Sequence, residues 1–136
     1  MTILKQINFL MKKKIIYTDN APKPIGPYSQ AVITANTLYI SGQIPLNPLT
    51  GELVKGDIKD QTRRVMENLK AILIAAGIDF SHVVKCSIFI LDMKNFPAIN
   101  EVYGEYFSAN APARETVQVS ALPMGVDIEI SCIAAV

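Results

Sequence analysis

Apolar residues recur at helical spacing in two stretches of this chain, and these stretches predict its two main helices. Over residues 57–76 the apolar positions fall three or four apart on one helical face, and Gly77 follows as a stop signal. Asn95 is suited to cap a second helix, and Pro97 fits its first turn. The apolar stripe of this helix continues to Phe107. Both helices are therefore expected to bury one face against a sheet.

Strands are predicted where β-branched and aromatic residues lie between turn signals. The strand at 83–91 is apolar on both faces, which indicates a central position in the sheet. Two hairpins are predicted, one around the tight link at Asn36 and one around the Pro and Gly bend at 122–125. The predicted strands are 15–17, 30–35, 37–41, 83–91, 115–121 and 126–134.

These elements predict an α+β fold in the order β-β-β-α-β-α-β-β, a mixed sheet with two helices packed on one face. A chain of 136 residues is long enough for one domain, which we place at residues 11–136. Residues 1–10 have helical spacing but no signal-peptide pattern, and Met11 could serve as a second start. We therefore interpret residues 1–10 as a dispensable extension.

Composition then limits the classes of partner. Half of the residues are apolar and 18% are charged, and the mean hydropathy is +0.27, so some apolar surface is expected to meet another subunit. The formal net charge is +1, and the only basic block is the lysine triplet at 12–14, which is read as a solvated tail. No apolar run is long enough to span a membrane. We expect a cytoplasmic protein with neither nucleic acid nor membrane as a partner.

The cysteines and the single histidine offer no metal site. Cys86 and Cys132 are far apart in the sequence, form no CxxC pair and lie in predicted buried strands, so both are expected to be free thiols. His82 is expected to be a capping or surface residue at a helix-to-strand joint. One histidine cannot assemble a site of the His/Cys type within one chain. No metal is predicted.

Two charged residues stand out because they lie in the most apolar stretch of the chain. Arg114 offers a rigid fork of donors that matches a carboxylate. Glu129 falls on the polar side of the alternating last strand, away from the helix-packed core, where it could activate water. An Arg-Glu bridge that only satisfies itself is the simpler alternative. Local sequence alone favours this bridge, since structural ion pairs also collect at strand ends.

The other candidates lie at loops and strand ends. Tyr28 belongs to a proline-rich loop, where a ligand contact and a loop anchor are about equally supported. Ser41 and Gly42 end a predicted strand, and the glycine indicates either a close approach to the backbone or only the strand terminus. The chain has no glycine-rich phosphate loop and no GxSxG elbow, so neither nucleotide binding nor serine hydrolase chemistry is supported.

Five short motifs in a fixed order carry a resemblance to a known family. Together they resemble the reactive intermediate deaminase (Rid) family, of the RidA type, and the likeness covers nearly everything after Met11. The motifs are residues 20–22 (NAP), 25–30 (IGPYSQ), 41–45 (SGQIP), 112–114 (PAR) and 126–130 (VDIEI).

This resemblance implies a homotrimer of the chorismate-mutase-like fold, with a central barrel formed by three sheets and active sites between subunits. Family members hydrolyse 2-imino acids such as 2-iminobutanoate and 2-iminopropanoate, and enamines such as 2-aminoacrylate, to 2-keto acids and ammonia. The resemblance implies no cofactor. It also implies that pyridoxal-phosphate-dependent dehydratases acting on serine or threonine supply these compounds.

The resemblance also implies roles for individual residues. Arg114 matches the arginine that holds the substrate carboxylate, and Glu129 matches the acid beside the attacking water. Tyr28 matches a tyrosine that closes the cleft, and the stretch with Ser41 and Gly42 lines the pocket. Thr116 stands where many relatives have cysteine, so it is expected to contribute through its backbone.

Two functional hypotheses follow from these residues. The first is a 2-imino acid deaminase. The second is a non-catalytic trimeric module that binds a small carboxylate such as a 2-keto acid in the same pocket. The loop at 108–111 is shorter than in some relatives, which leaves the size of the preferred substrate open.

Overall fold

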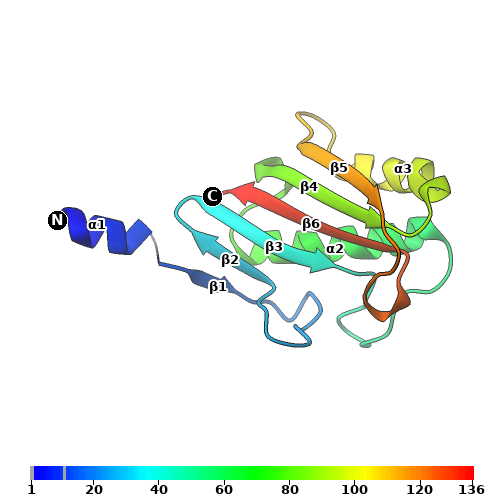
Figure 1. Cartoon of the computed structure of the whole chain (residues 1–136), viewed down its shortest axis with the longest axis horizontal. Coiled ribbons are helices and arrows are strands. Elements are labelled where there is room, and N and C mark those ends of the chain that lie inside the picture. The colour runs from blue at the N-terminus through cyan, green and yellow to red at the C-terminus, as the bar shows by residue number, and fades with distance from the viewer. Residues whose placement is uncertain (1, 11) are drawn as a thin grey trace.

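A computed structural model describes residues 2–10 and 12–136, and its main elements follow the predicted order after one N-terminal helix (Figure 1). The helices are α1 (Ile3–Leu10), α2 (Ile58–Ala75) and α3 (Phe96–Tyr106). The strands are β1 (Lys14–Ile16), β2 (Ala31–Thr34), β3 (Thr37–Gln43), β4 (Val83–Ile90), β5 (Ala113–Gln118) and β6 (Ile128–Ala135). Three short 3-10 helices, η1 (Phe80–His82), η2 (Met93–Asn95) and η3 (Pro123–Gly125), join them.

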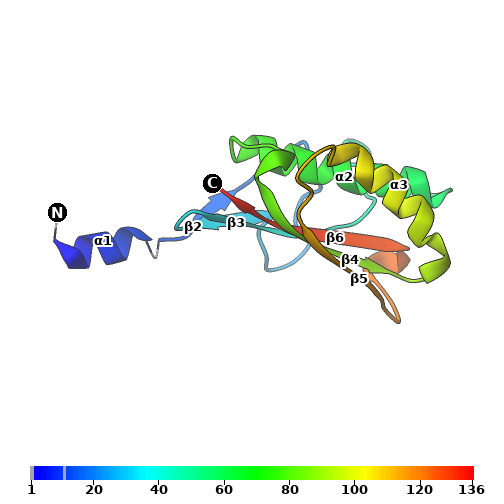
Figure 2. The ribbon, with the colours of Figure 1, turned by 90° about the horizontal axis from the view of Figure 1, so that it is seen from above.

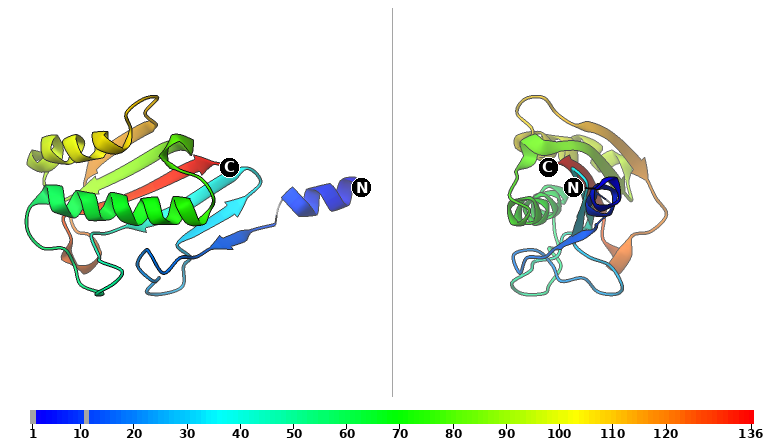
Figure 3. Two further views of the ribbon diagram at one scale, coloured as in Figure 1. Left: turned by 180° about the vertical axis from the view of Figure 1, so that it is seen from behind. Right: turned by 90° about the vertical axis from the view of Figure 1, so that its left-hand side faces the viewer.

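All six strands belong to one sheet in the order β1-β2-β3-β6-β4-β5. Neighbouring strands are antiparallel except β4 and β5, which are parallel. Helices α2 and α3 lie side by side on one face of this sheet (Figures 2 and 3). No helix of residues 2–10 and 12–136 packs on the other face, so the predicted α+β fold with two helices on one side is confirmed.

The predicted hairpin between the last two strands is wrong. β6 lies between β3 and β4, and β5 lies outside β4 at the edge of the sheet (Figure 1). The chain crosses through α3 to place β5 parallel to β4, and then returns to fill the position between β3 and β4. The Pro and Gly bend is present as η3, but it does not join two paired strands.

The core lies between the sheet and α2. Val65, Leu69 and Leu73 on α2 are fully buried against strand residues such as Ile88 and Ile130. Burying an aliphatic side chain of this size contributes about 1.5–3 kcal/mol. The apolar stripe predicted for this helix is therefore the stripe that holds it on the sheet.

The sequence predicted one helix cap, Asn95, and this prediction is right in position only, whereas the cap of α2 was not predicted. An oxygen of Asp57 accepts hydrogen bonds from the backbone nitrogens of Lys59 at 2.6 Å and Asp60 at 3.2 Å, which caps α2. Asn95 does precede α3, but its side chain makes no capping hydrogen bond. Asp92 instead caps the preceding turn η2, so that α3 continues directly from an already ordered turn.

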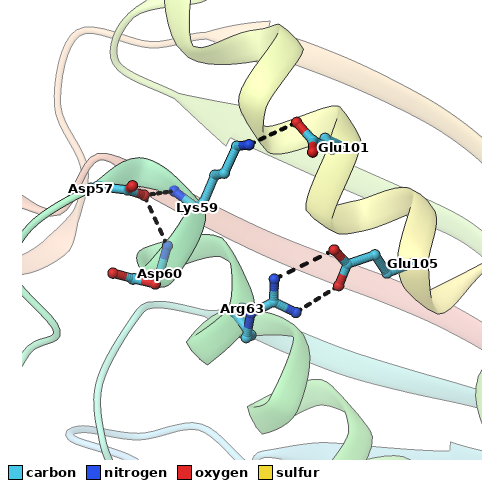
Figure 4. A network of polar contacts seen from close by, with 6 residues as sticks. All are labelled: Asp57, Lys59, Asp60, Arg63, Glu101 and Glu105. Carbon is cyan, nitrogen blue, oxygen red and sulfur yellow. Dashed lines mark hydrogen bonds and ion pairs between the residues drawn. The ribbon is translucent and has the colours of Figure 1, made fainter.

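Two ion pairs connect α2 with α3 on the outer surface (Figure 4). The Lys59 Nζ lies 2.8 Å from Glu101 Oε2, and the Arg63 Nη1 lies 2.6 Å from Glu105 Oε2. The guanidinium of Arg63 holds the pKa of Glu105 below its usual value. Because these side chains are exposed, each pair is screened by salt and adds little to stability.

Both cysteines are buried and free, as predicted. They lie directly opposite each other, Cys86 on β4 and Cys132 on β6, which the sequence did not indicate. His82 accepts from the backbone of Asp79 in a capping box at the joint between α2 and β4, which confirms its predicted structural role. In the part of the chain that the structure describes, no helix is long and apolar enough to cross a membrane.

Candidate active site

The best candidate site is a cavity of about 480 Å³ on the sheet face that carries no helix. It contains four of the predicted site residues, which come from the proline-rich loop, the end of β3 and the start of β6. Its lining residues are Ile25, Tyr28, Ser41, Gly42, Ile44, Pro123, Met124 and Glu129. A wider, more open hollow of about 610 Å³ shares Tyr28 and Ser41 with it, but no acidic residue lines that hollow. The cavity with the carboxyl group is therefore the better candidate.

Among the residues that the structure describes, Glu129 is the only charged one that lines this cavity. Its neighbours on β6, Ile128 and Ile130, are fully buried on the helix side, so alternation directs Glu129 to the opposite face, as predicted. Partial burial raises the pKa of Glu129 above its ordinary value. A carboxylate with a raised pKa accepts a proton from water more readily, which suits a general base.

Gly42 lies directly beneath the carboxyl group of Glu129. A Cβ atom at position 42 would lie 2.7 Å from Glu129 Cδ and 2.8 Å from Glu129 Oε2. The strand also continues past Gly42 to Gln43, with an irregular register against β6 between Ile40 and Gln43. Gly42 is therefore required by a close approach, and the interpretation that it only ends a strand is wrong.

The deaminase hypothesis predicts that Gly42→Ala lowers the turnover of imino acids about a hundredfold, because the methyl group would displace the Glu129 carboxyl group by about 1 Å. The unfolding temperature should fall only slightly, because the obstructing atoms are the end of a flexible side chain. Steady-state kinetics and thermal unfolding measure the two effects. Gly104→Ala is the matched control, since an added Cβ there meets nothing within 4 Å. A fully active Gly42→Ala variant would show that Glu129 does not need this space.

Tyr28 and Ser41 hold the proline-rich loop against the cavity. The Ser41 hydroxyl donates to the carbonyl of Ser29 at 2.6 Å, and the Tyr28 hydroxyl accepts from the Ile25 backbone nitrogen at 3.2 Å. The Tyr28 side chain is half exposed at the cavity mouth. Tyr28 thus anchors its own loop, which was one of the two predicted roles, and it also lines the cavity, while its contact with a ligand stays a prediction.

Gln30 also positions this loop, and sequence reasoning missed it. It is buried, its amide oxygen accepts from the Thr18 backbone nitrogen at 2.8 Å, and its amide nitrogen donates to the carbonyl of Pro22 at 3.0 Å. A polar residue at the point where an apolar strand begins is the signal that could have identified it.

Arg114 lies elsewhere in the single chain. Its Nη1 donates to Asn100 Oδ1 on α3 at 2.6 Å, and its guanidinium carbon lies 5.3 Å and 5.0 Å from the ring centroids of Phe96 and Tyr103. These contacts place Arg114 on the helix face of the sheet, whereas Glu129 faces the other side. The predicted Arg-Glu bridge is therefore wrong.

Thr116 shares the placement of Arg114. It lies on β5 opposite Ile88, a fully buried core residue, and its hydroxyl has no hydrogen-bond partner in the structure described. The structure thus brings together Tyr28, Ser41, Gly42 and Glu129, and it leaves Arg114 and Thr116 on the edge strand. The sequence did not predict that Arg114 contacts α3. Its pattern shows which face of that helix is apolar, but it does not show which strand the helix lies beside.

The fold and the cavity define a class of protein, a single-sheet α+β protein with a small-ligand pocket built around one carboxyl group. The family model described as Endoribonuclease L-PSP matches residues 18–136. The chain therefore belongs to this family, which includes the proteins named Rid and RutC.

Individual relatives refine this assignment. A RutC family protein from Pyrococcus horikoshii is 59% identical over 122 residues, which cover 90% of this chain and 97% of that protein. The human 2-iminobutanoate/2-iminopropanoate deaminase is 46% identical over 122 residues, which cover 90% of this chain and 89% of that protein. The crystal structure of RidA from an Antarctic Psychrobacter species is 46% identical, with a TM-score of 0.87, and covers 90% of this chain and 99% of that one.

Proposed function

We propose that this protein hydrolyses 2-imino acids and their enamine tautomers, among them 2-iminobutanoate, 2-iminopropanoate and 2-aminoacrylate, to 2-keto acids and ammonia. The observation that carries the proposal is the half-buried carboxyl group of Glu129, which lies over Gly42 in a cavity that no other charged residue of the described ranges lines. The 46% identity to a human protein named as such a deaminase supports it.

The chemistry needs only one acid at the reacting carbon. The C=N carbon of a protonated imine is already electrophilic, so a positioned water can add to it while the Glu129 carboxylate accepts a proton. The carboxyl group then returns this proton to the nitrogen of the adduct. As the C–N bond breaks and ammonia leaves, the hydroxyl group of the adduct becomes the C=O group and gives its proton to the Glu129 carboxylate, which yields the 2-keto acid. Tyr28, Ser41 and the backbone at Gly42 would orient the substrate. No step requires a cofactor.

The substrate carboxylate requires a cation, which the cavity of one chain does not supply. We propose that a neighbouring subunit supplies it, with Arg114 on the edge strand reaching the Glu129 cavity of the next chain in a homotrimer, and with the backbone at Thr116 beside it. An arginine can bind a carboxylate through two parallel hydrogen bonds, which fixes its orientation as well as its position.

The sheet face without helices supports this assembly. One row of apolar side chains crosses four neighbouring strands on that face. It consists of Ile15 on β1, Val32 on β2, Tyr39 on β3 and Ile133 on β6. Ile15 is 52% exposed and Tyr39 is 45% exposed in the single chain. An exposed apolar row of this kind is typical of a subunit interface. Light scattering that gave a monomer in solution would contradict the shared site.

The ribonuclease activity in the family description receives no support from the residues of this chain. Its one histidine, His82, lies 3.2 Å from Asp79 in a capping box, and the net charge is only +1. Two buried free thiols are consistent with the cytoplasmic location that we propose.

A competition assay tests the proposed reaction. A threonine or serine dehydratase releases the imino acid, semicarbazide traps it, and the amounts of keto acid and trapped product are followed. We expect the wild-type protein to increase keto acid formation at the expense of the trapped product. A folded trimer that binds a 2-keto acid but leaves this ratio unchanged would favour the non-catalytic binding module.

A further inference from the structure

The Glu129 cavity has a polar part and an apolar part. Tyr28, Ser41 and Glu129 form the polar part, and Ile25, Ile44, Pro123 and Met124 form the apolar part. The reacting carbon of a 2-imino acid carries three groups, which are the carboxylate, the nitrogen and the side chain. Because the first two require polar partners, the third is directed to the apolar part of the cavity.

Met124 holds a backbone conformation that disfavours a residue with a side chain. Its φ is 58° and its ψ is 18°, in the left-handed region that glycine adopts most easily. The turn is closed by hydrogen bonds from Gly125 N to Leu122 O at 3.2 Å and from Val126 N to Pro123 O at 3.3 Å. Glycine at position 124 would form this turn with less strain, so the turn itself does not require methionine. Strained residues of this kind collect at ligand-binding sites.

The Met124 side chain lies where it can contact a ligand. It lines the Glu129 cavity and also an adjacent hollow that contains Gln61 and Asp127. It is 56% exposed in the single chain, so it is not part of the packed core. Methionine is unbranched and polarizable, and it adapts to apolar groups of different shape.

We propose that Met124 determines substrate specificity by forming the wall against which the side chain of the imino acid packs. The protein should then favour imino acids with longer aliphatic side chains, such as the one derived from leucine, over the short one derived from alanine. This inference rests on the proposed function and deepens it.

The test compares these two imino acids in the same assay. D-amino acid oxidase generates them from D-leucine and D-alanine, because oxidation removes the stereocentre and gives the same imines as the L-amino acids. Wild type, Met124→Ala, Met124→Gly and the control Met93→Ala are compared by kcat/KM. Met93 is an exposed methionine in η2 that does not line the Glu129 cavity.

Both Met124 variants should lose about tenfold in kcat/KM for the leucine-derived imino acid, mainly through KM, and change less than about twofold for the alanine-derived one. Met93→Ala should behave as wild type. Met124→Gly should unfold at the wild-type temperature or above, because glycine suits the left-handed conformation. A Met124→Gly variant with unchanged stability and lower kcat/KM for the leucine-derived imino acid would show that Met124 acts on specificity and is not needed for the fold.

Each contrary outcome has a distinct meaning. An active wild type whose leucine-to-alanine ratio is unchanged in both variants would overturn the role of Met124 and leave the proposed function intact. Equal losses for both imino acids would also overturn it. A wild type inactive with both imino acids would overturn the proposed function and this inference together.

Discussion

We expect Arg114→Ala to lower the kcat/KM for 2-imino acid hydrolysis by at least about a hundredfold and to leave the fold and the proposed trimer intact, because the substrate would lose the group that we propose orients its carboxylate. Arg114 is exposed on the edge strand and its polar partner is Asn100, so its removal leaves no core cavity. The semicarbazide assay measures turnover, and light scattering with circular dichroism measures assembly and fold. Arg63→Ala is the matched control, since Arg63 is also exposed and also contacts α3.

Mixing two inactive variants will show which subunit supplies Arg114. If Arg114 and Glu129 meet across an interface, a trimer that contains both Arg114→Ala and Glu129→Gln chains has some sites with both wild-type residues. Refolding the two variants together should therefore restore part of the activity. Mixtures that stay inactive although native mass spectrometry shows mixed trimers would contradict a site that two subunits share. Full activity of Arg114→Ala alone would exclude its role as a clamp.

The second large effect is expected for Glu129→Gln. We expect it to lower kcat by about 10²–10⁴-fold, because glutamine cannot accept a proton from the attacking water. Binding of a 2-keto acid, measured by calorimetry, should largely persist, because the variant keeps Arg114, the proposed carboxylate clamp. Loss of binding by a folded variant would instead show that Glu129 positions the clamp.

The pH dependence of the same residue provides an independent check. Because burial raises the pKa of Glu129, the wild-type rate should rise with pH through a value above 4.5, the ordinary pKa of glutamate. Stability changes in the opposite direction, because the folded state binds this proton more tightly than the unfolded state. The free energy of unfolding should therefore fall as pH rises from 4.5 through the raised pKa. Both changes should be absent in Glu129→Gln. A wild-type rate that is flat across this range would contradict the general-base role.

The local sequence pattern was sufficient to predict much of the structure of this protein. Helical spacing predicted α2 to within a residue or two at each end, and the position of α3. Period-two alternation on the last strand predicted that Glu129 faces away from the core. The resemblance to the Rid family identified four of the eight residues that line the cavity. These features depend on residues that lie within a few positions of each other in the chain. They can therefore be predicted from the sequence alone.

Tertiary structure decided the strand order and the two separate locations of the predicted site residues. An alternating strand shows which of its faces is buried but not which strand lies beside it, because backbone hydrogen bonds form equally well with any neighbour. The sequence therefore could not show that β6 lies between β3 and β4, which places Glu129 over Gly42. Nor could it show that β5 is the edge strand, with Arg114 on the helix face. Residues far apart in the chain meet only through these long-range pairings, which follow from packing the whole chain.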